Sequence, residues 1–165
     1  MDKTGRKIEV IKKYIHNVSK YSTYAYGSIP RDIAQNACNS YGGAISLGNI
    51  IGLVDTTITG NGKNGLIFTL SNVYFNNGMF GEKGVISYRE IAKTRKIPGG
   101  IFCSDYNQQA LIDLLSLLAN IEGKDLAGTI DDFNDRANTA IDKANDILNT
   151  VSKGLGVLQS FLEDE

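Results

Sequence analysis

Short apolar runs separated by turn residues occupy the middle of the chain. The runs are rich in β-branched and aromatic residues, each connection carries Gly or Asn, and they cover residues 51–58, 65–70, 73–75 and 84–88. Runs of this kind are typical of strands that pair with their neighbours in sequence. The pattern therefore predicts an antiparallel β-meander over about residues 50–91.

A helical period precedes the meander. Apolar residues recur every three or four positions from Ile8 to Val18, with lysines between them, which predicts an amphipathic helix over about residues 5–20. A second helix is expected over about residues 29–41, because Ser28 is a suitable cap and Pro30 suits a first turn. Residues 21–27 lie between the two helices, and we expect them to form a loop.

Two more helices are expected after the meander, over about residues 105–121 and 129–153, with Ser104 or Asp105 capping the first. A short connection at residues 122–124 would make them a C-terminal helical hairpin. Residues 89–96 fit either one turn of helix or a continued strand. The predicted fold is thus α+β, and 165 residues suit a single domain spanning 1–165.

Charge is distributed unevenly although the net charge is only -1. Through Ile101 there are 13 basic and 6 acidic residues, and from Phe102 onward there are 4 basic and 12 acidic residues. One interpretation is that the acidic C-terminal helices lie against the basic N-terminal part. The other is that one surface is presented to a partner of opposite charge.

The cysteines and the N-terminus bear on the cellular compartment. Cys38 and Cys103 are too few for a disulfide framework and do not have a CxxC spacing, so we expect reduced thiols. The first residues lead into an amphipathic pattern and not into the apolar stretch of a signal peptide. A cytoplasmic location follows as an expectation.

Residues 60–65 match the GxGxxG pattern of dinucleotide-binding loops. In that fold, the glycines lead into a helix whose N-terminus faces a pyrophosphate. Here a β-type run starting at Leu66 follows, so the loop is expected to be a hairpin turn whose glycines supply positive φ angles. Lys63 at its tip remains a candidate contact for an anion.

Residues for familiar catalytic or metal sites are few. His16 is the single histidine, and its lysine neighbours favour a surface position, so we expect no catalytic triad, zinc site or cofactor. Asp131, Asp135, Asp142 and Asp146 contain i,i+4 pairs that suit either a divalent cation or a solvated acidic face. No catalytic residue is predicted.

Three tyrosines stand out beside basic residues at Tyr21, Tyr24 and Tyr26. Tyrosine is favoured at binding surfaces because it offers a large contact area at a low entropic cost. The rings fit core packing, a protein interface or, least well, nucleobase stacking, since the chain is slightly acidic and has no RNP-like strand.

Part of the meander is similar to GRAM and bacterial PH-like domains. The similarity lies in Gly65-Leu-Ile-Phe-Thr69, Asn72-Val-Tyr-Phe75 and Ile86-Ser-Tyr-Arg-Glu-Ile91, about a sixth of the chain. The resemblance implies a bent meander in which Thr69 closes the first hairpin strand while Tyr88 and Ile91 turn inward. It also implies a binding platform for lipids, peptides or neighbouring domains.

These observations favour a non-enzymatic, cytoplasmic protein-binding module of bacterial or phage origin, acting as an adaptor, an immunity protein or an inhibitor. The expected partner-binding residues are Tyr21, Tyr24, Tyr26, Lys63 and Arg89. Homo-oligomerisation through the C-terminal helices is a further hypothesis, because residues 155–162 form an apolar tail that would otherwise dock on the core.

Two alternatives remain open. The first is a PH-like binder of anionic lipid headgroups, using Lys63, Lys83, Arg89, Lys93, Arg95 and Lys96. The second is a small enzyme with a site made of Asp55, Thr57, Tyr88 and Arg89.

Overall fold

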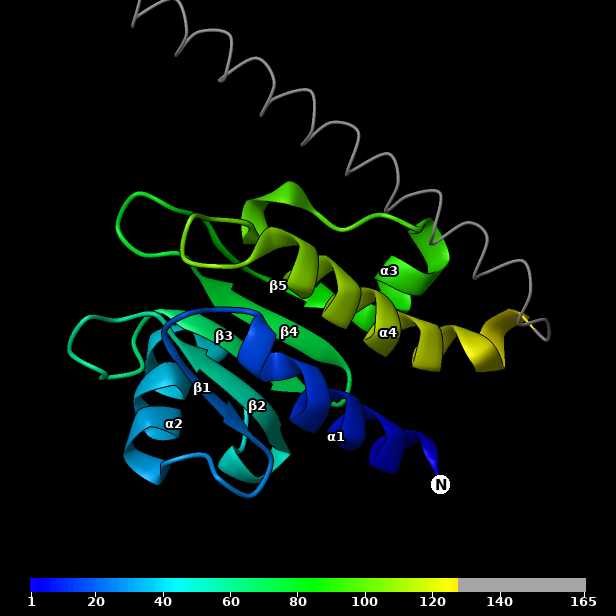
Figure 1. Ribbon diagram of the computed structural model, residues 1–165, viewed down its shortest axis with the longest axis horizontal. Helices are drawn as coiled ribbons and strands as arrows, with labels where there is room; N and C mark the ends of the chain where they lie inside the picture. The colour runs from blue at the N-terminus through cyan, green and yellow to red at the C-terminus, as the bar shows by residue number, and fades with distance from the viewer. Residues whose placement is uncertain (128–165) are drawn as a thin grey trace, which may run out of the picture. The chain divides into compact units, whose positions relative to one another are not determined.

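The computed structural model describes residues 1–127, with side chains through Gly123 (Figure 1). The fold is α+β: helices surround one five-stranded antiparallel sheet. The expected helix at 129–153, the aspartates at 131–146 and the apolar tail lie outside the described residues. The C-terminal hairpin, the single-domain organisation and oligomerisation through that segment therefore stay predictions.

The sheet confirms the meander. Its strands follow the chain in the order β1-β2-β3-β4-β5, and each pairs antiparallel with the next. The bounds are β1 (Ser22–Ala25), β2 (Ile50–Asp55), β3 (Gly65–Thr69), β4 (Asn72–Asn76) and β5 (Lys83–Ser87). Thr69 ends β3, where its hydroxyl donates to the Asn72 carbonyl and accepts from the Ser71 and Asn72 amides.

The first strand corrects the loop expected at residues 21–27. Ser22–Ala25 pairs with β2 from Asp55 to Gly52 and so forms one edge of the sheet. Four residues are too few for their own alternation to specify a strand, and pairing with β2 decides their conformation instead.

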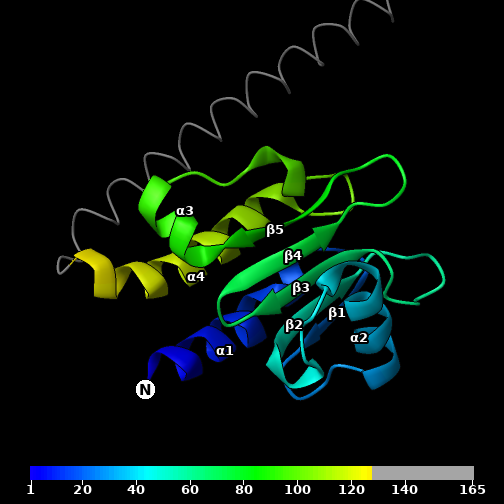
Figure 2. The same cartoon turned by 180° about the vertical axis from the view of Figure 1, so that it is seen from behind.

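Helices cover both faces of the sheet. The views in Figures 1 and 2 show α1 and α4 on one face and α2 on the other. Gly52 of β2 allows α1 to approach closely, because a Cβ there would lie 2.8 Å from Ile11 and from Ile15. On the opposite face, Leu53 and Ile67 pack with Ile33 of α2 in a second apolar cluster.

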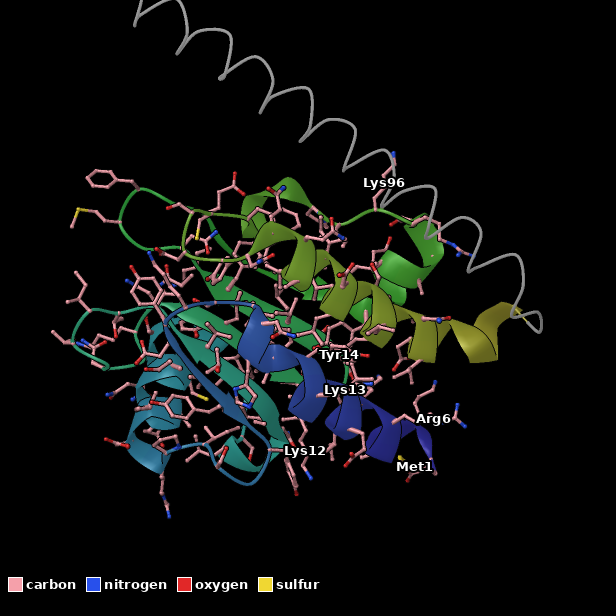
Figure 3. All side chains as sticks on the ribbon, viewed as in Figure 1. Met1, Arg6, Lys12, Lys13, Tyr14 and Lys96 are labelled. Carbon is pink, nitrogen blue, oxygen red and sulfur yellow. The ribbon has the colours of Figure 1, made fainter. Side chains whose placement is uncertain are left out.

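The N-terminal helices are shorter than expected. α1 (Lys3–Tyr14) is capped by Asp2, which accepts from the Gly5 amide, and one 3₁₀ turn follows at Ile15–Asn17. Figure 3 shows Arg6, Lys12 and Lys13 projecting from α1, and all three are exposed, as an amphipathic helix requires. α2 (Arg31–Ala37) continues as a π-helical turn at Cys38–Gly42.

Two expected caps are wrong. Pro30, and not Ser28, immediately precedes α2, and the Ser28 hydroxyl donates to the Ala25 carbonyl. α4 (Gln108–Ala127) begins after Asn107, whose side chain accepts from the Ala110 amide, so neither Ser104 nor Asp105 is its cap. Asn and Ser both bond nearby backbone readily, so sequence alone does not decide which one caps.

The last helices also differ from the expectation in detail. Residues 89–96 are mainly helical, within α3 (Tyr88–Thr94), and not a continued strand. α4 continues through the connection expected at 122–124, and Gly123 is buried within it. Short 3₁₀ turns at Leu47–Asn49 and Gly99–Ile101 complete the described elements.

An ion pair between the buried Lys7 and the part-buried Glu122 holds α1 against α4. Lys7 is only 2% exposed, and its ammonium donates to the Glu122 carboxylate and to the Leu70 carbonyl. The same ammonium lies 5.4 Å from the centre of the Tyr88 ring. Lys3 adds a longer contact to Glu122, at 3.4 Å. The two helices and the β3–β4 turn are thereby fixed to one another around a charged group.

Candidate functional site

The β2–β3 and β4–β5 connections emerge from the same end of the sheet, which we call the hairpin end. Asp55 pairs with Gly65, Gly65 with Asn76, and Asn76 with Lys83, so these four strand ends lie in one row. Figures 1 and 2 show both loops projecting beyond the sheet on that side. The opposite end carries the β3–β4 turn and the start of α3.

The β4–β5 loop presents two large apolar side chains. The Asn77 amide donates to the Glu82 carbonyl at 2.9 Å, and the Gly81 amide donates to the Gly78 carbonyl at 3.3 Å. The inner bond closes a four-residue turn with Met79 and Phe80 at its central positions. Met79 is 90% exposed and Phe80 is 98% exposed. Central turn positions usually carry small or polar residues, so this pair is unusual.

Asn77 fixes the base of that loop. Its side-chain amide donates to the Gly100 carbonyl at 2.9 Å and to the Ile101 carbonyl at 3.0 Å. The Tyr106 hydroxyl donates to its carbonyl oxygen at 3.1 Å. Burial raises the pKa of the Tyr106 hydroxyl, so it stays protonated as a donor. Three partners on the 99–106 segment thus hold the turn that carries Met79 and Phe80.

The β2–β3 loop presents a third apolar side chain from a second closed turn. The Gly60 amide donates to the Thr57 carbonyl at 3.3 Å, which places Ile58 at a central turn position, where it is 97% exposed. Asp55, 1% exposed, organises this loop from below. Its carboxylate accepts from the Thr57 amide at 2.9 Å, the Thr57 hydroxyl at 2.6 Å and the Gly62 amide at 3.1 Å.

Gly62 explains why the GxGxxG segment is not a phosphate cradle. Its φ angle is +78°, and a Cβ there would lie 2.5 Å from the Ile33 carbonyl oxygen. Its amide already donates inward to Asp55. Because β3 begins at Gly65, the loop leads into a strand and not into a helix. The expected hairpin connection is confirmed, with positive φ at Gly60, Gly62 and Gly65.

Hydrogen bonds join the end of β4 to the base of the β2–β3 loop. The Asn76 side chain donates to the Lys63 carbonyl at 3.0 Å and to the Asn64 side chain at 3.2 Å. We define the turn face as the apolar side chains Ile58, Met79 and Phe80 together with Lys63 of the β2–β3 loop and Lys83 at the start of β5. Three almost fully exposed large apolar residues on one end of a molecule mark a candidate interaction site.

The turn face is positively charged at its border. The Lys83 ammonium donates to the Ser40 carbonyl at 2.8 Å, and neither Lys63 nor Lys83 has a carboxylate within ion-pair distance among residues 1–123. Glu82 is turned away, because a Cβ added to Gly100 would meet its carboxylate at 1.5 Å. Within residues 1–123, therefore, no carboxylate neutralises either ammonium group.

The three expected tyrosines do not form one surface. Tyr24 is partly buried and packs against the apolar cluster beneath α2. Tyr21 precedes β1 at the hairpin end, and the Lys20 ammonium lies 5.6 Å from its ring centre. Tyr26 follows β1 at the opposite end, where it lines a shallow hollow of about 590 Å³ with Arg31. Tyr21 and Tyr26 therefore lie at opposite ends of β1, and the role of the three tyrosines in partner binding stays a prediction.

Lys63 and Arg89 are also separated. Lys63 belongs to the turn face, whereas Arg89 is exposed on α3, which begins at the opposite end of the sheet. The same separation divides the basic set expected to bind lipid, since Lys93 and Lys96 accompany Arg89. Figure 3 shows Lys96 far from the two hairpin loops. The six basic residues thus do not form one patch.

The residues of the possible enzyme site do not converge either. Asp55 and Thr57 bond to each other at the hairpin end. Tyr88 lies at the opposite end, fully buried, and its hydroxyl donates to the Asn72 carbonyl at 2.8 Å. Burial, with a smaller contribution from the Glu122 charge, raises the pKa of Tyr88. All three side chains are used in holding the fold.

Other chemically active side chains have ordinary surroundings. His16 is exposed and shares a 2.7 Å hydrogen bond with the Thr23 hydroxyl. Cys38 and Cys103 are free thiols whose pKa values are raised by burial. Within the described part of the chain, no cluster of His, Cys, Asp or Glu is placed to hold a metal, and no helix is long and apolar enough to cross a membrane.

Comparisons with known proteins add no assignment. No model of a known protein family matches this chain, and no match was found among curated proteins or solved structures. The similarity to GRAM and PH-like domains therefore stays a prediction, although Tyr88 and Ile91 are buried at 0% and 5% exposure.

Sequence reasoning missed the apolar part of the turn face. The signal was Asn77-Gly-Met-Phe-Gly81, in which two large apolar residues occupy the centre of a glycine-bounded turn. Two apolar residues within a turn have neither helical nor strand periodicity, so the hydrophobic pattern does not reveal them.

Proposed function

We propose that this protein is a protein-binding module that contacts its partner through the turn face. The observation that supports this function is the exposure of Ile58, Met79 and Phe80, each at least 90%, on turns closed by their own hydrogen bonds. Large apolar side chains in this position contribute nothing to the core, so their presence needs another explanation.

Burial of these side chains would be a substantial driving force. Removing one large apolar side chain from water is worth about 1.5–3 kcal/mol. The closed turns reduce the entropic cost of binding, because Met79 and Phe80 are already held on a fixed backbone. A few buried anchors of this type usually carry most of the affinity of a protein interface.

The remaining parts of the proposal are a non-enzymatic role as an adaptor, immunity protein or inhibitor, and action in the cytoplasm. Two free cysteines are typical of a reducing compartment and support the cytoplasm. The similarity to GRAM and PH-like domains supports a binding role, since those domains are mainly binding platforms.

Site-specific photo-cross-linking tests the proposed function. A photoreactive phenylalanine analogue is introduced at position 80 and, as a matched control, at position 89 on α3, and each variant is irradiated in a lysate of the native host. We expect a discrete protein adduct from position 80 and none from position 89. A discrete adduct from position 89 alone would assign binding to α3, and the absence of any protein adduct would refute a protein-binding role.

Lipid binding is the second candidate function, since apolar tips beside Lys63 and Lys83 are also found on proteins that insert into bilayers. Co-sedimentation with vesicles containing an anionic lipid tests it. Binding that increases with anionic lipid and disappears at high salt would favour the bilayer over a protein.

A further inference from the structure

The shape and rigidity of the turn face restrict the kind of partner it fits. The Met79–Phe80 turn projects from the sheet, is closed by the Gly81 bond to Gly78 and is anchored below by Asn77. A rigid projection with apolar corners is complementary to a concave apolar pocket. Partition into a bilayer has no need of a fixed backbone, so the three anchoring bonds of Asn77 favour a structured partner.

Charge restricts the partner further. Lys63 follows Ile58 on the β2–β3 loop and Lys83 begins β5 after Phe80, and within residues 1–123 neither lysine has a carboxylate partner. The Asp55 carboxylate is hydrogen-bonded to amides of its own loop, and Glu82 lies against Gly100. Bringing the turn face onto a neutral or basic surface would desolvate or repel two ammonium groups, whereas carboxylates at the rim of the pocket would compensate them.

Two lysines are fewer than membrane recognition normally requires. Binding to anionic lipid by charge typically uses clusters of four to eight basic residues. Arg89 and Lys93 cannot add to the turn face, because they lie on α3, which begins at the opposite end of the sheet, and Figure 3 shows Lys96 far from both loops. The charge at the hairpin end therefore suits a local acidic rim better than an extended anionic surface.

We infer that the partner is a folded protein with an apolar pocket that accepts Met79 and Phe80 and whose rim carries carboxylates facing Lys63 and Lys83. This inference rests on the proposed function and specifies the partner for the same surface. Ile58 contacts the border of the pocket from the second loop. The apolar pair supplies most of the affinity, and the lysines set orientation and selectivity.

The test measures the yield of the position 80 photo-adduct in three charge backgrounds, in native lysate at low salt. The backgrounds are Lys63→Glu with Lys83→Glu, Lys63→Arg with Lys83→Arg, and a control reversal that combines Lys93→Glu on α3 with Lys96→Glu just after α3. We expect the first to lower the yield at least about fivefold and the other two to leave it within about twofold. Urea unfolding of each variant verifies that it is folded.

The possible failures are distinguishable. An undiminished adduct in the Lys63→Glu, Lys83→Glu background would overturn the acidic rim while leaving the protein-binding proposal intact. An equal loss in the Lys93→Glu, Lys96→Glu background would also overturn it, because net charge would then suffice. Absence of any protein adduct, together with Phe80-dependent binding to vesicles of phosphatidylcholine and about 30% phosphatidylserine, would refute both the inference and the proposed function.

Discussion

Replacing Asp55 by Ala should lower the free energy of unfolding by about 3 kcal/mol, because the Asp55 carboxylate holds the β2–β3 loop. The carboxylate is 1% exposed and accepts three hydrogen bonds, two of them from the backbone amides of Thr57 and Gly62. A buried donor left without an acceptor costs about 1–3 kcal/mol. The Gly62 bond is buried and should cost nearly the full amount, whereas water can partly replace Asp55 at the part-buried Thr57 amide.

Urea denaturation measures this loss. A slope of about 2 kcal/mol per M, ordinary for a domain of this size, converts 3 kcal/mol into a midpoint lower by about 1.5 M. Thr59→Ala is the matched control, because Thr59 is exposed in the same loop and accepts only from the Asn61 side chain. We expect that variant to stay within about 0.5 kcal/mol of the parent. A midpoint for Asp55→Ala within about 0.3 M of the parent would refute the idea that Asp55 organises the loop.

Three further outcomes follow from contacts elsewhere in the fold. Lys7→Met should lower the free energy of unfolding by about 3 kcal/mol, because it removes the buried partner of both Glu122 and the Leu70 carbonyl. Lys3→Met removes a 36% exposed group and should cost under about 1 kcal/mol. Equal losses in urea denaturation would contradict this. Burial raises the pKa of Glu122, but hydrogen bonds and charges from Lys7 and Lys3 outweigh burial and lower that pKa below 4.5. The stability that the ionised carboxylate contributes is therefore present above pH 4.5 and is lost as the pH falls through the folded-state pKa. The Glu122→Gln variant should therefore have a lower urea midpoint than the parent at pH 6, and the two midpoints should converge in acid. A difference in midpoint that does not change with pH would contradict this. Gly62→Ala should lower the free energy of unfolding by more than about 2 kcal/mol and Gly60→Ala by about 1 kcal/mol, since only at position 62 would the new Cβ meet a backbone carbonyl. Thermal unfolding of the two variants measures the difference, and equal losses would contradict this.

Much of the meander could be predicted because its information is local. Residues 65–69 and 83–87 carry β-branched and aromatic side chains between glycine or asparagine turns, and those turns fix which strands are neighbours. The buried stripe of α1 could be predicted for the same reason, because Ile11 and Ile15 recur at helical spacing and are fully buried.

The remaining features depend on contacts that the local sequence does not encode. Ser22–Ala25 is a strand because β2 lies beside it. A connection was expected at residues 122–124, yet Gly123 is buried within α4, where packing offsets the cost of about 1 kcal/mol of a Gly inside a helix. The apolar turn residues were missed for a different reason: Met79 and Phe80 occupy positions that a strand pattern treats only as a connection.

The affinity of the cross-linked partner for a variant without the apolar turn pair tests the central claim most directly. Met79→Ser combined with Phe80→Ser removes two side chains worth about 1.5 kcal/mol or more each on burial, so Kd should rise at least about 100-fold. The urea midpoint should not change, because both side chains are exposed, and Arg89→Ala should leave Kd unchanged. An unaltered Kd for the double variant, with weaker binding of Arg89→Ala, would contradict a binding role for the turn face.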